Sequence, residues 1–275
     1  MSHRYKITKS ILFYLLLISI VLFWSFPIFW TFISSFKSDN LIVSQNLNLF
    51  FHPTLDNYRK IFASHNFFHF LYNSAYVAIV TTFIVFLISF PGAYSLSRFK
   101  TGGAFFVFII MLTRVAPPAA VLMPYFLIFR IFKLNNTLTA LVIVNIAQNL
   151  SFMILMLKSF IDEIPYSIEE AARIEGASWY QVFILLIFPL ARSGVLTTSI
   201  FTFIFTWNEY LFAMVLCSSN QVKTLPVAAG DFVTAYAIEW GPIFSSGVVI
   251  LLPIVVLSFF VQKYIVKGLT FGAVK

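Results

Sequence analysis

The sequence predicts an all-α membrane protein with six transmembrane helices. Of its 275 residues, 60% are hydrophobic and 10% are charged, and the mean hydropathy is +0.92. A soluble domain has about 45–50% apolar and about 25% charged residues, and it cannot hide this much apolar surface in its core. Six apolar segments are long enough to cross a bilayer, which takes a helix of about 20 residues. The composition therefore excludes a soluble enzyme or a DNA-binding domain.

The apolar segments define one transmembrane domain over residues 1–275. Each segment is predicted to be a helix because backbone groups in lipid must be hydrogen-bonded internally. The first resembles a signal peptide, but its apolar run is too long, and Pro27, Phe29 and Trp30 occupy the place of a small-residue cleavage site. It is therefore predicted to be an uncleaved span. The predicted spans cover residues 10–35, 70–96, 104–126, 138–157, 190–216 and 243–265.

Basic residues predict the orientation of these spans. The formal net charge is +8, from 18 Lys and Arg against 10 Asp and Glu. The basic residues stand singly between apolar runs and form no cluster that would follow a phosphate backbone, so no nucleic-acid partner is expected. With six spans, eleven of them fall on the side of the two termini and six on the other side. The positive-inside rule then places both termini in the cytoplasm.

The cysteine and histidine residues, and the lack of a phosphate-binding pattern, argue against disulfide, metal and ATP sites on this chain. A single cysteine, Cys217, excludes an internal disulfide and a cysteine-based metal cluster. Three of the four histidines lie in or beside the external loop over residues 37–68, with no acidic partner at ligand spacing. Neither a metal site nor catalytic residues are therefore expected. The sequence lacks the phosphate-binding pattern Gly-x-x-x-x-Gly-Lys-Ser/Thr, so energy from ATP must come through a partner.

The loop over residues 158–189 is the most polar cytoplasmic segment. Pro165 stops the preceding helix, and Ser167 with Glu170 fits a capping box that begins a short helix outside the bilayer. Gly176 allows that helix to end or another backbone to approach closely. A membrane protein that keeps half of its ten carboxylates in one loop is predicted to bind a partner through it. These five acidic residues are Asp162, Glu163, Glu169, Glu170 and Glu175.

In this loop the sequence resembles the EAA motif of bacterial ABC importer permeases. That motif reads Glu-Ala-Ala, three residues, Gly, nine residues, Ile, one residue, Leu-Pro. Residues 170–172, Gly176 and Pro189 match it at the same spacing. Leu186 and Phe188 stand where the motif has Ile and Leu, and both replacements are apolar.

Further stretches are similar to the carbohydrate-uptake branch of this family, which includes the MalG subunits of maltose systems. The resemblance covers nearly the whole chain, and it implies the type I (MetI-like) fold of ABC importer permeases in a bacterial or archaeal cell membrane. The stretches are Asn73-Ser74, Pro117-Pro118, Asn136-Thr137, Trp207-Asn208-Glu209-Tyr210 and residues 267–275.

The resemblance implies that the loop is a coupling helix docked in a cleft of an ATP-binding subunit. Glu170 would make a charge-dependent contact there, and the alternative is that it only caps its own helix. The C-terminal tail is expected to touch the same subunit in an extended conformation. The implied coupling residues are Ser167, Glu170, Ala171, Ala172, Glu175 and Gly176, and the implied tail contacts are Gly268, Leu269, Thr270 and Gly272.

The resemblance also implies the partners of the chain. Two ATP-binding subunits would hold ATP and Mg, so no cofactor is expected on this chain itself. A second permease similar to MalF would enclose the path with it, and an extracytoplasmic solute-binding protein would deliver a sugar or oligosaccharide. One alternative is a self-sufficient secondary transporter, although no repeated half is visible in the sequence. Another is an ABC permease for a different solute, such as glycerol 3-phosphate.

Ionisable residues inside the predicted spans indicate a substrate path, because they are costly in lipid. Arg114 lies in the third span, and Glu209 lies in the fifth beside Asn208 and Tyr210. Together they offer the donors, acceptors and aromatic face that a sugar requires. The alternative is that Arg114 pairs with Glu209 or with the partner subunit and fixes the packing of the helices.

Overall fold

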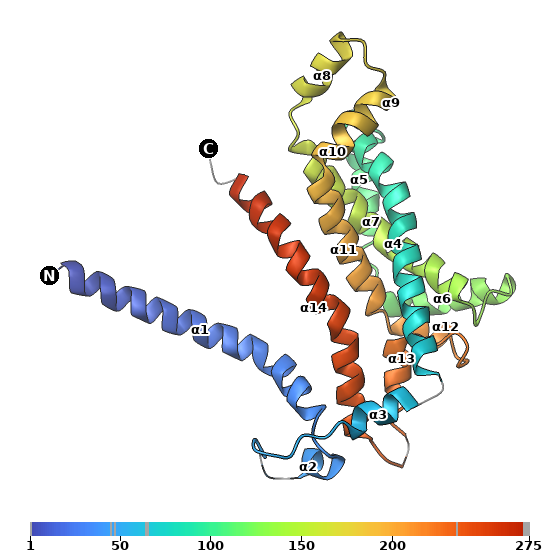
Figure 1. Cartoon of the computed structure of the whole chain (residues 1–275). Helices are drawn as coiled ribbons and strands as arrows, with labels where there is room; N and C mark the ends of the chain where they lie inside the picture. Colours follow the sequence, from blue (N-terminus) through green and yellow to red (C-terminus); the bar gives the residue numbers. More distant parts are fainter. Residues whose placement is uncertain (1, 45, 47, 64–65, 235, 272–275) are drawn as a thin grey trace. The chain divides into compact units, whose positions relative to one another are not determined.

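The computed structural model describes residues 2–44, 46, 48–63, 66–234 and 236–271. In this part of the chain the regular structure is helical (Figure 1), apart from one isolated antiparallel bridge between Val233 and Ile238. The predicted all-α class is confirmed. The chain forms two compact units, one of residues 1–65 with 229–251 and one of residues 66–228 with 252–275.

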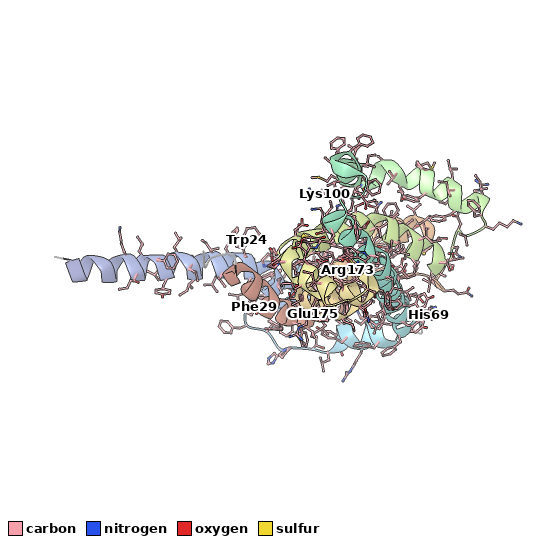
Figure 2. The ribbon with its side chains drawn as sticks, turned by 90° about the horizontal axis from the view of Figure 1, so that it is seen from above. Trp24, Phe29, His69, Lys100, Arg173 and Glu175 are labelled. Atoms are coloured by element: carbon pink, nitrogen blue, oxygen red, sulfur yellow. The ribbon has the colours of Figure 1, made fainter. Side chains whose placement is uncertain are left out.

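The first unit contains the long helix α1, two short helices and the beginning of the long helix α14. Within α1, residues Lys9–Ser34 are apolar enough to cross a membrane. Trp24 and Phe29 project from this helix with 74% and 59% of their surface exposed (Figure 2), as suits a helix that faces lipid. The helices are α1 (Ser2–Ser34), α2 (Asp39–Val43), α3 (Asp56–Ala63) and the beginning of α14 (Trp240–Phe271).

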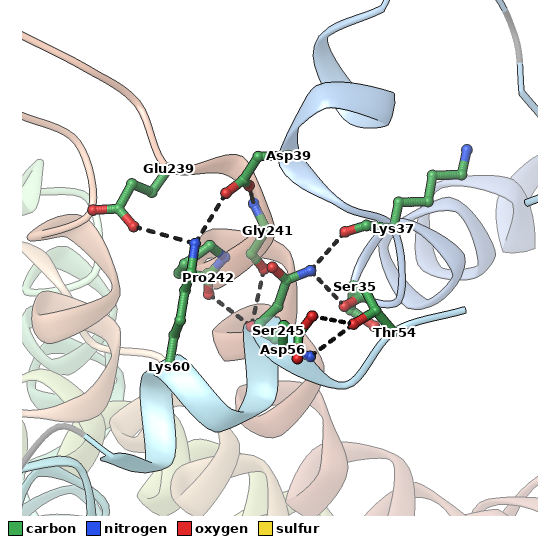
Figure 3. Close-up of polar contacts among 11 residues, drawn as sticks. Ser35, Lys37, Asp39, Thr54, Asp56, Lys60, Glu239, Gly241, Pro242 and Ser245 are labelled. Carbon is green, nitrogen blue, oxygen red and sulfur yellow. Dashed lines mark hydrogen bonds and ion pairs between the residues drawn. The ribbon is translucent and has the colours of Figure 1, made fainter. Parts of the chain in front are cut away.

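A polar cluster ties the loop after α1 to α3 and to the start of α14 (Figure 3). The Asn57 side chain donates to two carbonyl oxygens of the loop, at 3.0 and 2.7 Å. The Gly241 amide donates to Asp39 at 2.8 Å, and a Cβ at position 241 would overlap the Asn57 side chain. Lys60 Nζ lies 3.2 Å from an oxygen of Asp39 and 4.0 Å from one of Glu239. Charge pairs and a close backbone approach thus fix this end of the unit.

The second unit is built on α4 (Phe67–Arg98), α7 (Leu138–Asp162) and α11 (Arg192–Trp207), which pack against one another. Gly194 on α11 lies so close to the Phe160 ring on α7 that a Cβ would overlap it, so a small residue sets the approach of these two helices. The shorter elements are α5 (Gly103–Leu112), α6 (Pro118–Ile131), α8 (Tyr166–Ile174), α9 (Trp179–Gln181), the π-helix η1 (Val182–Ile187), α10 (Phe188–Leu190), α12 (Leu211–Leu216) and α13 (Leu225–Gly230).

The long helices differ from the six predicted spans at two places. The segment predicted as the third span forms α5 and α6, because Pro117 and Pro118 between them supply no backbone N–H and their rings oppose a continuous helix. The segment predicted as the fifth span forms α11 and α12. Among the described residues, four helices are long and apolar enough to cross a membrane. The segments Trp179–Leu190 and Arg192–Trp207, bent by 72°, make a fifth if they are one span.

Candidate coupling site and candidate substrate path

The short helix α8 carries most of the predicted coupling residues. It begins after Pro165 and ends at Glu175 and Gly176, whose φ of +93° is a left-handed conformation that glycine adopts without strain. The predicted capping box is wrong, because Pro165 is the N-cap residue and Ser167 lies inside the first turn. Pro165 can cap because its fixed φ and missing N–H suit a helix start.

A capping box does form one turn after α8. The Gln181 amide donates to Ser178 Oγ at 3.2 Å, and the Ser178 amide donates to Gln181 Oε1 at 2.7 Å. This reciprocal pair begins α9, which continues directly into η1. A defined turn therefore connects α8 to the helical segment that enters the core.

The two adjacent glutamates of α8 have opposite environments. Glu170 is exposed, and no ion pair joins it to another residue in the described part of the chain. Ala171, Glu175 and Gly176 are exposed as well. Glu169 is buried, with only 1% of its surface exposed. Since successive residues of a helix point about 100° apart, one carboxylate faces the core when its neighbour faces outward.

Glu169 is held by two residues at the end of α4. Its Oε1 is hydrogen-bonded and ion-paired with Arg98 Nε. Its Oε2 accepts a hydrogen bond from the Tyr94 hydroxyl at 2.9 Å. Arg98 Nη2 also donates to the carbonyl oxygen of Ile164 at 2.8 Å, just before α8 begins. From the sequence, Glu169 was only one of the five acidic residues of the loop, and Arg98 was only one of the eleven basic residues on the side of the termini.

Aromatic contacts join the end of α4 to the segment that follows α8. The Tyr94 ring centroid lies 5.1 Å from that of Phe183 on η1, and Phe99 lies 5.2 Å from Trp179. The Arg173 guanidinium carbon lies 4.4 Å from the centroid of the Trp179 ring, a cation–π contact. The end of α4 is thus packed against both α8 and the segment that follows it. Figure 2 shows Arg173 and Glu175 close together near the end of α8.

A hollow of about 350 Å³ lies between α8 and η1. Beside it, apolar side chains stand outward: Ile174 has 86%, Tyr180 73% and Leu185 71% of its surface exposed. This surface combines acidic and apolar character at one end of the unit. The residues that line the hollow are Ala172, Glu175, Gly176, Ala177, Gln181, Val182, Leu185 and Leu186.

The predicted tail contacts fall at the end of the described chain. α14 continues through Phe271, so Gly268, Leu269 and Thr270 are helical rather than extended as expected. The remaining predicted contact, Gly272, lies outside the described residues.

The four predicted path residues lie around one hollow of about 460 Å³. Within it, the Glu209 carboxylate accepts from the amides of Phe212 at 2.7 Å and Ala213 at 2.9 Å, so it caps α12. Arg114 Nη1 donates to the carbonyl oxygen of Gln148 at 3.2 Å. In the described part of the chain no ion pair joins Arg114 to Glu209, so the predicted pairing of these two residues with each other is wrong. Pairing of either residue with the partner subunit stays a prediction. The lining residues of the hollow are Arg114, Pro118, Asn145, Gln148, Asn149, Phe205, Asn208, Glu209, Tyr210, Leu211 and Phe212.

Three amide side chains of α7 that line the same hollow were not among the predicted path residues. Asn145, Gln148 and Asn149 all line the hollow. Their spacing of three and four residues puts them on one face of a helix, and that spacing was visible inside an apolar segment. Asn145 and Asn149 are buried, and each donates from Nδ2 to the carbonyl oxygen four residues earlier in α7, at 2.9 Å.

Comparison with known proteins identifies the family. Residues 84–271 match the family model described as binding-protein-dependent transport system inner membrane component. The chain belongs to this family, and it is therefore a membrane component of a transport system rather than an enzyme. A transport system that depends on a binding protein also argues against the self-sufficient secondary transporter.

Individual relatives narrow the comparison. The chain is 31% identical to the trehalose/maltose transport system permease protein MalG of Thermococcus litoralis, over 99% of both chains. It is 34% identical to the trehalose transport system permease protein SugB of Mycobacterium tuberculosis, over 90% of this chain and 92% of that one. It is 33% identical to the sulfoquinovosyl glycerol transport system permease protein SmoH of Agrobacterium fabrum, over 91% of this chain and 88% of that one.

Solved structures show the fold. A chain of a bacterial ABC transporter that imports the acidic polysaccharide alginate superposes with a TM-score of 0.80 at 24% identity, covering 96% of this chain and 99% of that one. A chain of the methionine ABC transporter MetNI superposes with a TM-score of 0.55 at 18% identity, covering 72% and 93%. The predicted fold, that of the type I ABC importer permeases, is confirmed.

Proposed function

We propose that the chain is the permease subunit of an ATP-driven importer. With a second permease similar to MalF, it forms the translocation path for a sugar or oligosaccharide that an extracytoplasmic binding protein delivers. Two ATP-binding subunits, which hold ATP and Mg, supply the energy. The chain crosses the cell membrane of a bacterium or archaeon several times, and both of its termini lie in the cytoplasm.

The observation that carries this proposal is the geometry of α8. Glu170 and Ala171 are exposed on a two-turn helix, beside a hollow and a set of exposed apolar side chains. A narrow helix with a free carboxylate fits a groove that offers a basic residue, and the apolar side chains gain by leaving water on docking. The ATP-binding subunit provides that groove, and Gly268, Leu269, Thr270 and Gly272 contact the same subunit.

The hollow beside Arg114 is the substrate path. It combines the amides of Asn145, Gln148 and Asn149 with the aromatic rings of Phe205 and Tyr210. Amides bind sugar hydroxyls, and aromatic faces pack against the C–H surfaces of sugar rings. This pairing of chemistries favours a carbohydrate over an apolar solute.

A second candidate is an anionic solute such as glycerol 3-phosphate. The observation that favours it is Arg114, which lines the hollow with no ion pair to another described residue. A guanidinium binds phosphate or carboxylate groups through paired hydrogen bonds. An acidic sugar satisfies both the arginine and the amides.

Transport by the reconstituted complex tests the proposal. Vesicles that contain both permeases and both ATP-binding subunits should take up a labelled solute only with the binding protein and ATP. Maltose, trehalose and glycerol 3-phosphate are the probes, and retention by the binding protein ranks them. Uptake by this chain alone, in sealed vesicles without nucleotide, would refute the proposal.

Replacement of the exposed carboxylate tests the docking contact. Glu170→Gln keeps the shape of the side chain and removes its charge, so we expect ATP-dependent uptake to fall at least tenfold. Glu163→Gln, at an exposed carboxylate just before α8, should leave uptake unchanged. Normal assembly and uptake by Glu170→Gln would show that the contact is not ionic.

A further inference from the structure

We propose that Arg98 and Glu169 form the mechanical link that carries the movement of α8 into α4. This inference rests on the proposed function, because it assigns the path by which an ATP-driven movement leaves the coupling helix. The two residues lie 71 positions apart in the sequence and belong to different helices. Their side chains are 8% and 1% exposed, on the inner face of the helix whose outer face carries Glu170.

The link has three points of attachment on Arg98. Its Nε pairs with the Glu169 carboxylate in the first half of α8, and its Nη2 donates to the Ile164 carbonyl before the helix begins. Its guanidinium carbon lies 5.9 Å from the centroid of the Tyr166 ring at the first helical residue. A planar, forked cation held at three places fixes orientation as well as distance. α8 is therefore attached to α4 at one defined angle.

Few other polar contacts attach this helix. In the part of the chain that the structure describes, Tyr94 and Arg98 supply every side-chain hydrogen bond between α8 and another helix. Both residues lie in the last turns of α4. A force applied to the exposed face of α8 reaches α4 through these hydrogen bonds, alongside the packing of α8 against η1.

The ion pair between Arg98 and Glu169 indicates that the contact fixes the orientation of α8 and does not only hold it against α4. A buried ion pair contributes little net stability, because desolvation of the two charges offsets their attraction, and apolar residues of similar volume often stabilise as well. Such residues would hold α8 against α4 but would let it slide and rotate. The charged fork holds one geometry only.

The other end of α4 is attached just as specifically. Asn73 Nδ2 donates to the carbonyl oxygens of Gln221 at 3.1 Å and Lys223 at 2.9 Å. Ser74 Oγ accepts a hydrogen bond from the Leu225 amide at 2.8 Å. Between its ends, α4 packs along α7, the helix that supplies the amides of the substrate path. One continuous 32-residue helix therefore connects the coupling end of the unit to the loop that precedes α13.

Site-directed labelling in the assembled complex tests this link. A single cysteine replaces Gln148 in the hollow, on a Cys217→Ser background, and its reaction rate with a maleimide is measured without nucleotide and after trapping with ATP, Mg and vanadate. We expect trapping to change the rate at least fivefold in the otherwise unaltered complex. Glu169→Gln should abolish this change while the complex keeps both ATP-binding subunits through purification. Glu163→Gln is the matched control and should retain the change.

The result that would overturn the link is a Glu169→Gln complex that keeps the nucleotide-dependent change in full. If Glu169→Gln does not assemble, Tyr94→Phe decides, because it removes one hydrogen bond and keeps the ring packed against Phe183. We expect it to assemble normally with a change reduced at least twofold, and a change of full size would overturn the link. Failure of the proposed function looks different, because the unaltered complex would then lack ATP-binding subunits or show no response to nucleotide.

Discussion

Replacing Glu169 by Gln should loosen α8 far more than the same replacement one residue later. Glu169→Gln removes the charge that faces Arg98 and leaves the buried arginine side chain without its ion-pair partner. Glu170→Gln removes a charge from an exposed side chain. The two variants differ by one position in the same helix, so each is the control of the other.

The free-energy cost of Glu169→Gln follows from the burial of the Arg98–Glu169 ion pair. Breaking a buried ion pair by removing one partner costs about 3–5 kcal/mol. Arg98 keeps 8% of its side chain exposed, and Tyr94 still donates to the glutamine oxygen, so the cost lies at the lower end, about 3 kcal/mol. This corresponds to a factor of about 150 in the local opening equilibrium. The exposed replacement should change it by less than about 0.5 kcal/mol, or roughly twofold.

Hydrogen exchange measured by mass spectrometry on the purified complex shows directly how much more often α8 opens in Glu169→Gln than in Glu170→Gln. Peptides that cover residues 166–176 should exchange about 100-fold faster in Glu169→Gln, up to the limit set by the opening of α8 itself. Peptides from the middle of α7 should not change. The combined Arg98→Met and Glu169→Leu variant should recover most of the protection, because an apolar pair avoids the unpaired charge. Equal exchange in Glu169→Gln and Glu170→Gln would refute the reasoning.

Three further predictions concern helix ends and packing. Glu209→Ala removes the cap of α12 and should lower stability by about 1 kcal/mol, which a thermal unfolding midpoint in detergent will show; an unchanged midpoint would contradict the capping role. Gly194→Val should force the Phe160 ring from its place at a cost of about 1–3 kcal/mol. Adding Phe160→Ala to this variant should partly restore the thermal unfolding midpoint. No restoration would mean that the clash is not with that ring. Gly176→Ala places a Cβ at a φ of +93° and should cost about 1 kcal/mol, seen as faster exchange at the end of α8, and no change there would contradict the strain.

The sequence predicted the all-α membrane class because composition and the length of apolar runs depend only on lipid as a solvent. It also pointed to the exposed part of α8, the proposed coupling helix, since the residues from Glu170 to Gly176 match a family motif at fixed spacing. It predicted the third span as one helix, although Pro117 and Pro118 break it. The mean hydropathy of a segment does not register such prolines, although each of them removes a backbone hydrogen bond and opposes a continuous helix.

The inner face of the coupling site was beyond sequence reasoning. Glu169 and Arg98 lie far apart in the chain, and nothing in the local pattern of either residue names the other as its partner. The capping box was expected with Ser167 as the N-cap, but the N-cap is Pro165, so the helix starts two residues too early for it. By contrast, the sequence was sufficient to predict that Asn145, Gln148 and Asn149 lie together, because their helical spacing places them on one face.

The most direct test of the whole account is photo-crosslinking from the exposed face of α8. A photo-reactive residue replaces Ile174, which is 86% exposed, and the control position is Phe23 on α1, which is 75% exposed. In the assembled, transport-competent complex, we expect a crosslink from position 174 to an ATP-binding subunit and none to that subunit from position 23. A complex that transports with ATP yet gives no crosslink from position 174 to either ATP-binding subunit would contradict it.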